Sequence, residues 1–348
     1  MSGINKDYMQ VIISEVIDHP EASSKSFVFS RPDGKILPAF RAGQYISLRL
    51  KIGESLLTRP YSLSSAPDCG RYTVTIQSNP EGFAADWMLE NLKAGDSIEI
   101  SHPQGEFFHN PEKDGINIIA VSGGSGITPF LSMACAIRDK AEDFNLTILY
   151  GNRTSDSILF KKELDSICAA TPKVKVVHVL SDEKAAGCET GFITAELIKK
   201  YSKEDSCVYV CGPEDMYRFL EKELPKLGLP KERIRSETPG VTRKVSSHDG
   251  FPKEAAGRKF SIKLKKGRAV YNIKASSEEP VLVAIERAGI SAPSMCRSGV
   301  CGWCKSRLVS GKCFIPGEND GRDREEVRNN EIRLCASFPV SDLVLELN

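Results

Sequence analysis

Four cysteines near the end of the chain constrain its fold more than any other feature. Three of them form the pattern C-x4-C-x2-C at Cys296, Cys301 and Cys304, and the fourth, Cys335, follows alone after a long gap. This is the ligand spacing of a plant-type [2Fe–2S] cluster, in which each of two irons takes two thiolates. Two glycines within the short loop allow its backbone to wrap closely around a cluster. The sequence therefore predicts a C-terminal domain built around these four metal ligands.

Other uses of the same cysteines fit less well. A dithiol redox motif at Cys301-Gly-Trp-Cys304 should lie near a βαβ pattern and would need neither Cys296 nor Cys335. A structural zinc site usually offers two close cysteine pairs, and here the second pair is missing. A disulfide framework is not expected because the first residues show no export signal.

Composition describes an ordinary globular protein. The 348 residues suggest two or three domains, and 41% hydrophobic with 27% charged residues allows an ample core. A net charge of +1 gives no reason to expect a nucleic-acid partner. No apolar run approaches the ~20 residues of a membrane span. Eleven cysteines without a signal peptide predict a reducing, cytoplasmic location.

Residues 1–113 have the pattern of an antiparallel β-barrel. Short runs such as 45–50 and 72–77 alternate with period two, turn formers separate them, and one helical stretch covers 84–92. Within this region lies the sequence R-P-Y-S at 59–62. Arginine suits a phosphate, tyrosine a planar ring and serine a ring nitrogen, so this motif is a candidate nucleotide site.

Residues 114–236 change to alternating strands and helices. Apolar runs at 116–121, 146–150, 174–180 and 207–211 predict buried parallel strands of a doubly wound α/β sheet. The first run leads into the glycine-rich loop at 122–129, where backbone can approach a pyrophosphate. This loop lacks the third glycine of the G-x-G-x-x-G fingerprint, and no acid ends the second strand, which disfavours a common Rossmann dehydrogenase.

Residues 237–258 have no periodicity and many turn formers, which predicts an interdomain linker. From 259 to 348 the pattern gives a hairpin, a helix at 281–289, the cysteine loop and two further strands.

Motifs in all three regions resemble the ferredoxin–NADP reductase superfamily. The sequence at 59–62 resembles its R-x-Y-S flavin motif, 122–129 its nicotinamide loop, and C-G-P at 211–213 its third signature. Residues 259–348 resemble the β-grasp fold of plant-type ferredoxins along their whole length. The resemblance implies an antiparallel β-barrel flavin domain, an α/β nicotinamide domain and an α+β ferredoxin domain.

The resemblance also implies roles for single residues. Arg59 would contact flavin phosphate, Tyr61 would pack on the flavin ring, Ser62 would reach its N5, and Cys211 would lie beside the nicotinamide. The second flavin motif of the family matches 82–89 and implies FAD. This chain has Ala85 where the family usually has Ser or Thr, which weakens FAD against FMN.

The predicted site residues fall into three groups. Ser62 and Cys211 are the candidate catalytic residues, and the candidate metal ligands are Cys296, Cys301, Cys304 and Cys335. The candidate cofactor-binding residues are Arg59, Tyr61, Ser62, Leu63, Gly82, Ala84, Ala85, Phe107, Gly123, Gly124, Gly126, Thr128, Cys211, Gly212 and Pro213. For Phe107, packing in the core is the alternative to a place near the flavin.

The nicotinamide donor is left open between NADH and NADPH. Arg153, Ser155 and Ser157 could hold a 2′-phosphate, whereas Asp182 and Glu183 would oppose it, as would Asp156. The acids favour NADH.

The domain order implies that electrons pass from the nicotinamide through the flavin to the cluster and on to a protein acceptor, such as an oxygenase or another iron enzyme. Three alternatives compete: a redox sensor, an electron-transfer subunit of a larger dehydrogenase, and a structural iron–sulfur protein. A cluster in such a dehydrogenase subunit has more compact cysteines, so the long gap before Cys335 opposes that alternative.

Overall fold

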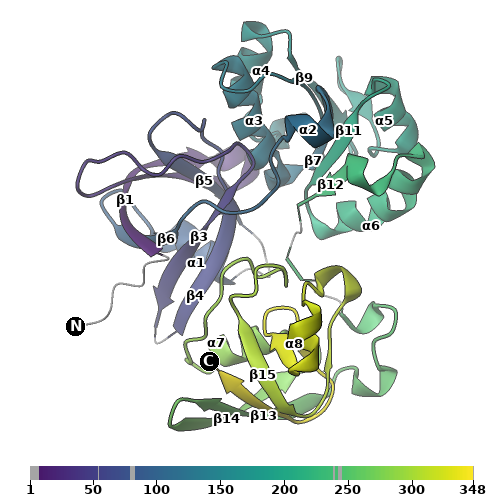
Figure 1. Ribbon diagram of the computed structural model, residues 1–348. Helices are drawn as coiled ribbons and strands as arrows, with labels where there is room; N and C mark the ends of the chain where they lie inside the picture. The colour runs from purple at the N-terminus through teal and green to yellow at the C-terminus, as the bar shows by residue number, and fades with distance from the viewer. Residues whose placement is uncertain (1–7, 54, 79–82, 238–239, 242–244, 348) are drawn as a thin grey trace. The chain divides into compact units, whose positions relative to one another are not determined.

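A computed structural model describes residues 8–53, 55–78, 83–237, 240–241 and 245–347 of the protein. The chain divides into two compact units (Figure 1). One contains Met1–Ile46 and Tyr61–Pro239, and the other contains Ser47–Pro60 and Gly240–Asn348.

The N-terminal sheet is antiparallel, as the period-two runs predict. Its strand order is β4-β3-β6-β1-β2-β5, and β1 pairs with β2 and β6 while β2 pairs with β5. In β6, the alternate residues Ile98 and Ile100 have buried side chains, whereas Ser97 and Glu99 are exposed. The elements are β1 (Tyr8–His19), β2 (Ser24–Ser30), β3 (Tyr45–Ile52), β4 (Ser55–Ser62), β5 (Tyr72–Gln77), α1 (Phe83–Asn91) and β6 (Ser97–Ser101).

The second sheet is parallel and has helices on both faces (Figure 1), which confirms the doubly wound prediction. Its order is β10-β9-β8-β7-β11-β12. In β7, Ile118 and Ala120 belong to one hydrophobic cluster while Ile119 and Val121 belong to another. Both faces are therefore buried, which explains the apolar run without alternation. The strands are β7 (Asn117–Gly123), β8 (Asn145–Asn152), β9 (Val174–Leu180), β10 (Glu189–Thr190), β11 (Cys207–Cys211) and β12 (Ile234–Ser236); the helices are α2 (Pro111–Asp114), α3 (Thr128–Arg138), α4 (Lys161–Ala170), α5 (Ala195–Tyr201) and α6 (Glu214–Glu223).

The C-terminal sheet is mixed, with the order β14-β13-β19-β15-β17. Strand β13 pairs antiparallel with β14 and parallel with β19, and α7 contributes several buried residues to the core beside this sheet. Its elements are β13 (Lys259–Lys266), β14 (Ala269–Ser276), α7 (Val281–Arg287), β15 (Lys305–Ser310), β16 (Cys313–Phe314), α8 (Arg324–Arg328), β17 (Glu331–Arg333), β18 (Phe338–Pro339) and β19 (Leu343–Leu347).

Part of the predicted linker is packed. Val245, Phe251 and Ala255 are buried in one cluster with Phe260 and Phe338 of the C-terminal domain. Residues 238–239 and 242–244 of this segment lie outside the described residues. The apolar residues between 245 and 255 thus belong to a small core, and the boundaries drawn at 113, 236 and 258 stay a prediction.

No helix in the described part of the chain has both the length and the apolar character needed to cross a membrane.

Candidate functional site

Two glycine-containing motifs meet at the carboxyl edge of the parallel sheet. Strands β7 and β11 are neighbours, with Ser122 opposite Cys211, so the loops that follow them leave the sheet side by side. A Cβ atom placed on Gly126 would lie 2.2 Å from the Cys211 carbonyl oxygen. Gly124 has a φ of +53°, in the left-handed region that favours glycine. Sterics therefore require glycines in this loop, and the ends of parallel strands are where nucleotides bind in such sheets.

The other residues of these motifs complete the same edge. A Cβ on Gly123 would lie 3.0 Å from Pro213, and one on Gly212 would lie 2.2 Å from Met216. Thr128 begins α3, and its hydroxyl donates to the Ser125 carbonyl at 3.1 Å. The Ser122 hydroxyl is buried and has no hydrogen-bond partner among the described residues, which fits a polar ligand at this loop.

This edge also contains a carboxylate that was not predicted from the sequence. Glu237 follows β12, and its N–H donates to the Val210 carbonyl at 3.0 Å, which continues the pairing with β11. Its Oε2 accepts hydrogen bonds from Ser62 Oγ at 3.2 Å and from Cys211 Sγ at 3.7 Å. The two predicted catalytic residues are thus brought together by a residue assigned to the linker. Its position directly after a strand was the available signal.

Burial changes the protonation of this group. It raises the pKa of Glu237 to about 7, against the lowering effect of the hydrogen bonds from Ser62 and Cys211. Burial also raises the pKa of the Cys211 thiol well above its ordinary value, and the nearby Glu237 adds to this rise. Near neutral pH the thiol therefore keeps its proton, while Glu237 Oε2 can gain or lose one.

The predicted flavin residues on β4 and directly after it occupy different environments. Ser62 and Tyr61 are both half-buried. Leu63 is fully buried, and its N–H donates to the Gln44 carbonyl at 2.9 Å. The guanidinium of Arg59 donates to the Thr58 carbonyl at 2.9 Å and lies 3.8 Å from the Glu286 carboxylate.

The remaining flavin candidates lie on α1 and before α2. Ala84 and Ala85 are in the first turn of α1, whereas Gly82 lies outside the described residues. The Phe107 ring is 5.8 Å from the Phe130 ring and 5.1 Å from the Tyr209 ring, within one hydrophobic cluster. This position matches the core-packing alternative for Phe107.

Acidic and hydroxyl groups also meet after β8 and β9. The Ser155 N–H donates to the Glu183 carboxylate at 2.8 Å. Hydrogen bonds from the side chain and backbone of Ser155 hold the pKa of Glu183 below its usual value. The carboxylate is therefore a fixed negative charge at the same edge of the sheet.

The four predicted cluster ligands converge in the C-terminal domain. Cys304 Sγ and Cys335 Sγ are 3.3 Å apart. Hydrogen bonds from the thiols of Cys301 and Cys335 hold the pKa of Cys296 well below its usual range. In the described part of the chain, no three or more His, Cys, Asp or Glu side chains surround the position of one metal ion. A [2Fe–2S] cluster needs only two thiolates at each iron.

The backbone of the cysteine loop is shaped by its glycines. Gly299 has a φ of +83° and Gly302 a φ of +77°. A Cβ on Gly299 would lie 2.0 Å from the carbonyl oxygen of Asn319. The loop thus has a left-handed, closely packed path that brings its thiols together, and this fits the predicted cluster.

Family models match three consecutive parts of the chain. Residues 15–109 match the oxidoreductase FAD-binding domain, 120–222 the oxidoreductase NAD-binding domain, and 268–340 the 2Fe-2S iron-sulfur cluster binding domain.

Similar proteins have the same extent. The 3-ketosteroid-9-alpha-monooxygenase ferredoxin reductase component of Mycobacterium tuberculosis is 28% identical over 97% of this chain and 94% of its own length. The glycine betaine monooxygenase reductase of Chromohalobacter salexigens is 24% identical over 90% of this chain and 89% of its own length. Phthalate dioxygenase reductase, a solved structure, aligns with a TM-score of 0.68, 25% identity and 98% of both chains.

The chain belongs to the ferredoxin–NADP reductase superfamily. Within this superfamily it combines an FAD-binding domain, an NAD-binding domain and a C-terminal [2Fe–2S] domain, in that order. It is an NAD(P)H-dependent oxidoreductase that passes electrons to its iron–sulfur domain and onward. The sequence prediction of the family, the cofactors and the reaction class is therefore confirmed.

Proposed function

We propose that this reductase is the electron-donating component of a multicomponent oxygenase or a related iron enzyme. Reductase components of 3-ketosteroid and glycine betaine monooxygenases, and of a stachydrine N-demethylase, align along nearly its whole length. The observation that carries the proposal is this shared three-domain extent, which ends in the 2Fe-2S domain.

We propose that Ser62, Cys211 and Glu237 form the site of hydride transfer. A bound flavin would accept a hydride from the nicotinamide and release electrons singly to the cluster. Ser62 would orient the flavin ring, and the neutral Cys211 thiol would limit the position of the nicotinamide. Glu237 would take up or release a proton near neutral pH, beside the Ser62 hydroxyl that donates to its Oε2.

We also propose roles for the remaining predicted residues. Tyr61 would pack on the flavin ring, and the loop at 123–128 with Gly212 and Pro213 would bind the nicotinamide nucleotide. Cys296, Cys301, Cys304 and Cys335 would hold the cluster.

The donor is NADH in this proposal. The fixed carboxylate of Glu183 beside Ser155 would repel the 2′-phosphate of NADPH at the edge of the sheet where the nucleotide binds.

We also propose a reducing compartment, the cytoplasm, as the location. None of the eleven cysteines forms a disulfide, which supports a location where disulfides do not persist.

The decisive experiment follows both cofactors in one reaction. The purified anaerobic protein is mixed with NADH or NADPH in a stopped-flow instrument, and the flavin and cluster absorbances are recorded. We expect flavin bleaching first and cluster reduction second, faster with NADH. Protein that holds both cofactors but bleaches with neither nucleotide would contradict the proposal.

A variant tests the order of electron transfer. Cys335→Ser should leave flavin reduction by NADH unchanged and abolish reduction of a one-electron protein acceptor such as cytochrome c. Cys313→Ser, in the same domain, is the matched control because this half-buried cysteine lies outside the ligand set. Equal loss of both activities in Cys335→Ser would refute the proposed order.

A further inference from the structure

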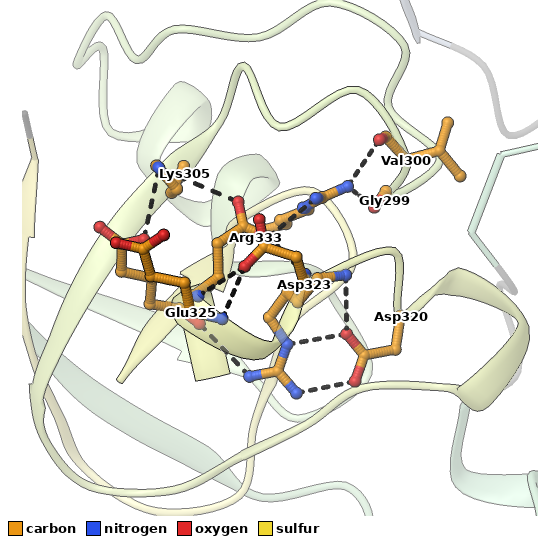
Figure 2. Close-up of polar contacts among 10 residues, drawn as sticks. Gly299, Val300, Lys305, Asp320, Asp323, Glu325 and Arg333 are labelled. Carbon is orange, nitrogen blue, oxygen red and sulfur yellow. Dashed lines mark hydrogen bonds and ion pairs between the residues drawn. The ribbon is translucent and has the colours of Figure 1, made fainter. Parts of the chain in front are cut away.

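Three consecutive carbonyls of the cysteine loop accept hydrogen bonds from buried side chains. Asn319 Nδ2 donates to the Ser298 carbonyl at 3.1 Å. Arg333 Nη1 donates to the Gly299 carbonyl at 2.8 Å and to the Val300 carbonyl at 2.6 Å. Figure 2 shows the Arg333 guanidinium directed at both oxygens. These carbonyls lie between the first two predicted cluster ligands.

The direction of these carbonyls fixes the direction of the next N–H groups. In a trans peptide the C=O of one residue and the N–H of the following residue point in opposite directions, and the described chain has no cis peptide. The N–H groups of Gly299, Val300 and Cys301 therefore point away from Asn319 and Arg333. In the same loop, the Ser298 N–H donates to Cys296 Sγ at 3.4 Å. Backbone N–H groups here thus already serve as donors to ligand sulfur.

The Arg333 guanidinium also forms an ion pair with Glu326. Its side chain is 9% exposed, and its Nη2 donates to Glu326 Oε2 at 2.8 Å. Glu326 Oε2 also accepts from the Asp323 N–H at 2.9 Å, in the capping box that begins α8. The path from α8 through Glu326 to Arg333 is a continuous set of charge-assisted hydrogen bonds, which are the strong ones in proteins.

The backbone at Gly321 lies directly against the guanidinium and leaves no room for a larger residue there. A Cβ placed on Gly321 would lie 2.7 Å from the Gly299 carbonyl oxygen and 2.8 Å from Arg333 Nη1. Removal of one partner from a buried ion pair leaves an uncompensated charge, so Arg333 and Glu326 must be examined together.

We propose that Arg333, supported by Glu326, is a positioning residue that turns the N–H groups of the cysteine loop toward the cluster sulfurs and so sets the reduction potential of the cluster. Hydrogen bonds to the sulfurs are a main determinant of the potential of such clusters. The inference rests on the proposed assignment of the four cysteine ligands. The four ligands alone do not fix the orientation of the loop N–H groups, and Arg333 is the proposed cause of that orientation.

The test is a redox titration of the cluster in the full-length protein, followed by electron paramagnetic resonance. Arg333→Met should make cluster reduction at a given potential at least tenfold less favourable, which is a shift of about 59 mV to more negative values. The double variant Arg333→Met/Glu326→Gln separates two causes. If the shift came only from an unpaired carboxylate, the double variant would regain the wild-type potential, and the proposal would be overturned. We expect the shift to persist.

Two further variants complete the design. Arg333→Lys keeps a positive charge for Glu326 but lacks the fork that reaches two carbonyls, so an intermediate shift is expected. Arg307→Met, on the exposed face of β15 with a 65% exposed side chain, should leave the potential unchanged. If Arg333→Met retains no cluster, the potential of Arg333→Lys tests the proposal instead. A wild-type potential in Arg333→Lys would overturn the proposal.

Iron and sulfide content and NADH-driven flavin bleaching are measured in every variant. If the wild-type protein binds no [2Fe–2S] cluster at these cysteines, the proposed function is contradicted. If the wild type binds the cluster and all Arg333 variants have the wild-type potential, only the inference about Arg333 is contradicted.

Discussion

Ser62 donates a hydrogen bond of 3.2 Å to Glu237, although the two residues are 175 positions apart in the chain. The contact joins the end of the strand that carries the flavin motif to the residue after β12, the edge strand of the parallel sheet. Cys211 donates to the same carboxylate oxygen. The proposed site of hydride transfer depends on this convergence of three side chains.

The raised pKa of Glu237 predicts a pH dependence of stability. Its folded pKa is about 7 against an ordinary value of 4.5, so the folded protein holds a proton here that the unfolded chain releases. This carboxyl group therefore lowers the free energy of unfolding as pH rises from about 4.5 to about 7. The effect is a few kcal/mol at most, since one pKa unit is about 1.4 kcal/mol.

Glu237→Gln should remove this dependence. Thermal unfolding of the wild type and the variant is compared at pH 5.5 and pH 8.0, and the wild type should lose more stability on this rise. Glu189→Gln, at a half-buried acid bonded to Lys200, serves as the control. An identical pH response in the wild type and Glu237→Gln would contradict the raised pKa.

Ser62→Ala and Cys211→Ala should slow flavin reduction by NADH. Each removes a donor to Glu237 and a group proposed to position the reacting rings. We expect losses of roughly 100-fold, at the lower end of the range for positioned proton-handling groups. Anaerobic stopped-flow rates at saturating NADH measure the effect. Cys188→Ala is the matched control. If Ser62→Ala and Cys211→Ala reduce the flavin as fast as this control does, neither residue belongs to the site.

Gly126→Ala should weaken nicotinamide binding. The new Cβ would lie 2.2 Å from the Cys211 carbonyl, so the loops after β7 and β11 must separate. We expect KM for NADH to rise about tenfold, because the misplaced backbone loses its contacts with the phosphates. Gly317→Ala, where nothing lies within 4 Å of the added Cβ, is the control. An unchanged KM in Gly126→Ala would argue against this loop as the nucleotide site.

Glu183→Gln should change the choice of donor. Without the fixed negative charge beside Ser155, kcat/KM for NADPH should rise roughly three- to fivefold relative to that for NADH, the range for a surface charge interaction. Steady-state kinetics with both nucleotides measures the ratio. The effect should shrink at high salt because the charge is accessible to solvent. If the ratio of kcat/KM for NADPH to that for NADH is unchanged, Glu183 does not contribute to the choice of donor.

Much of the protein could be predicted from local patterns. Period-two runs predicted the antiparallel sheet, uninterrupted apolar runs the parallel one, and the spacing of Cys296, Cys301 and Cys304 the cluster domain. In each case the signal lies within one segment, because strand burial and loop ligation depend on neighbours along the chain.

The remaining features depend on packing between distant segments. Glu237 belongs to the site only because β12 pairs with β11, and Phe107 is part of the core only because Phe130 and Tyr209 pack against it. Arg333 has no motif of its own, yet it holds two carbonyls of a loop that lies more than thirty positions earlier. The sequence alone determined the family and the cofactors, and it predicted the four ligand cysteines. Only the tertiary structure decided which side chains hydrogen-bond to the predicted site residues and to the cysteine loop, because such hydrogen bonds arise only when separate strands and loops fold together.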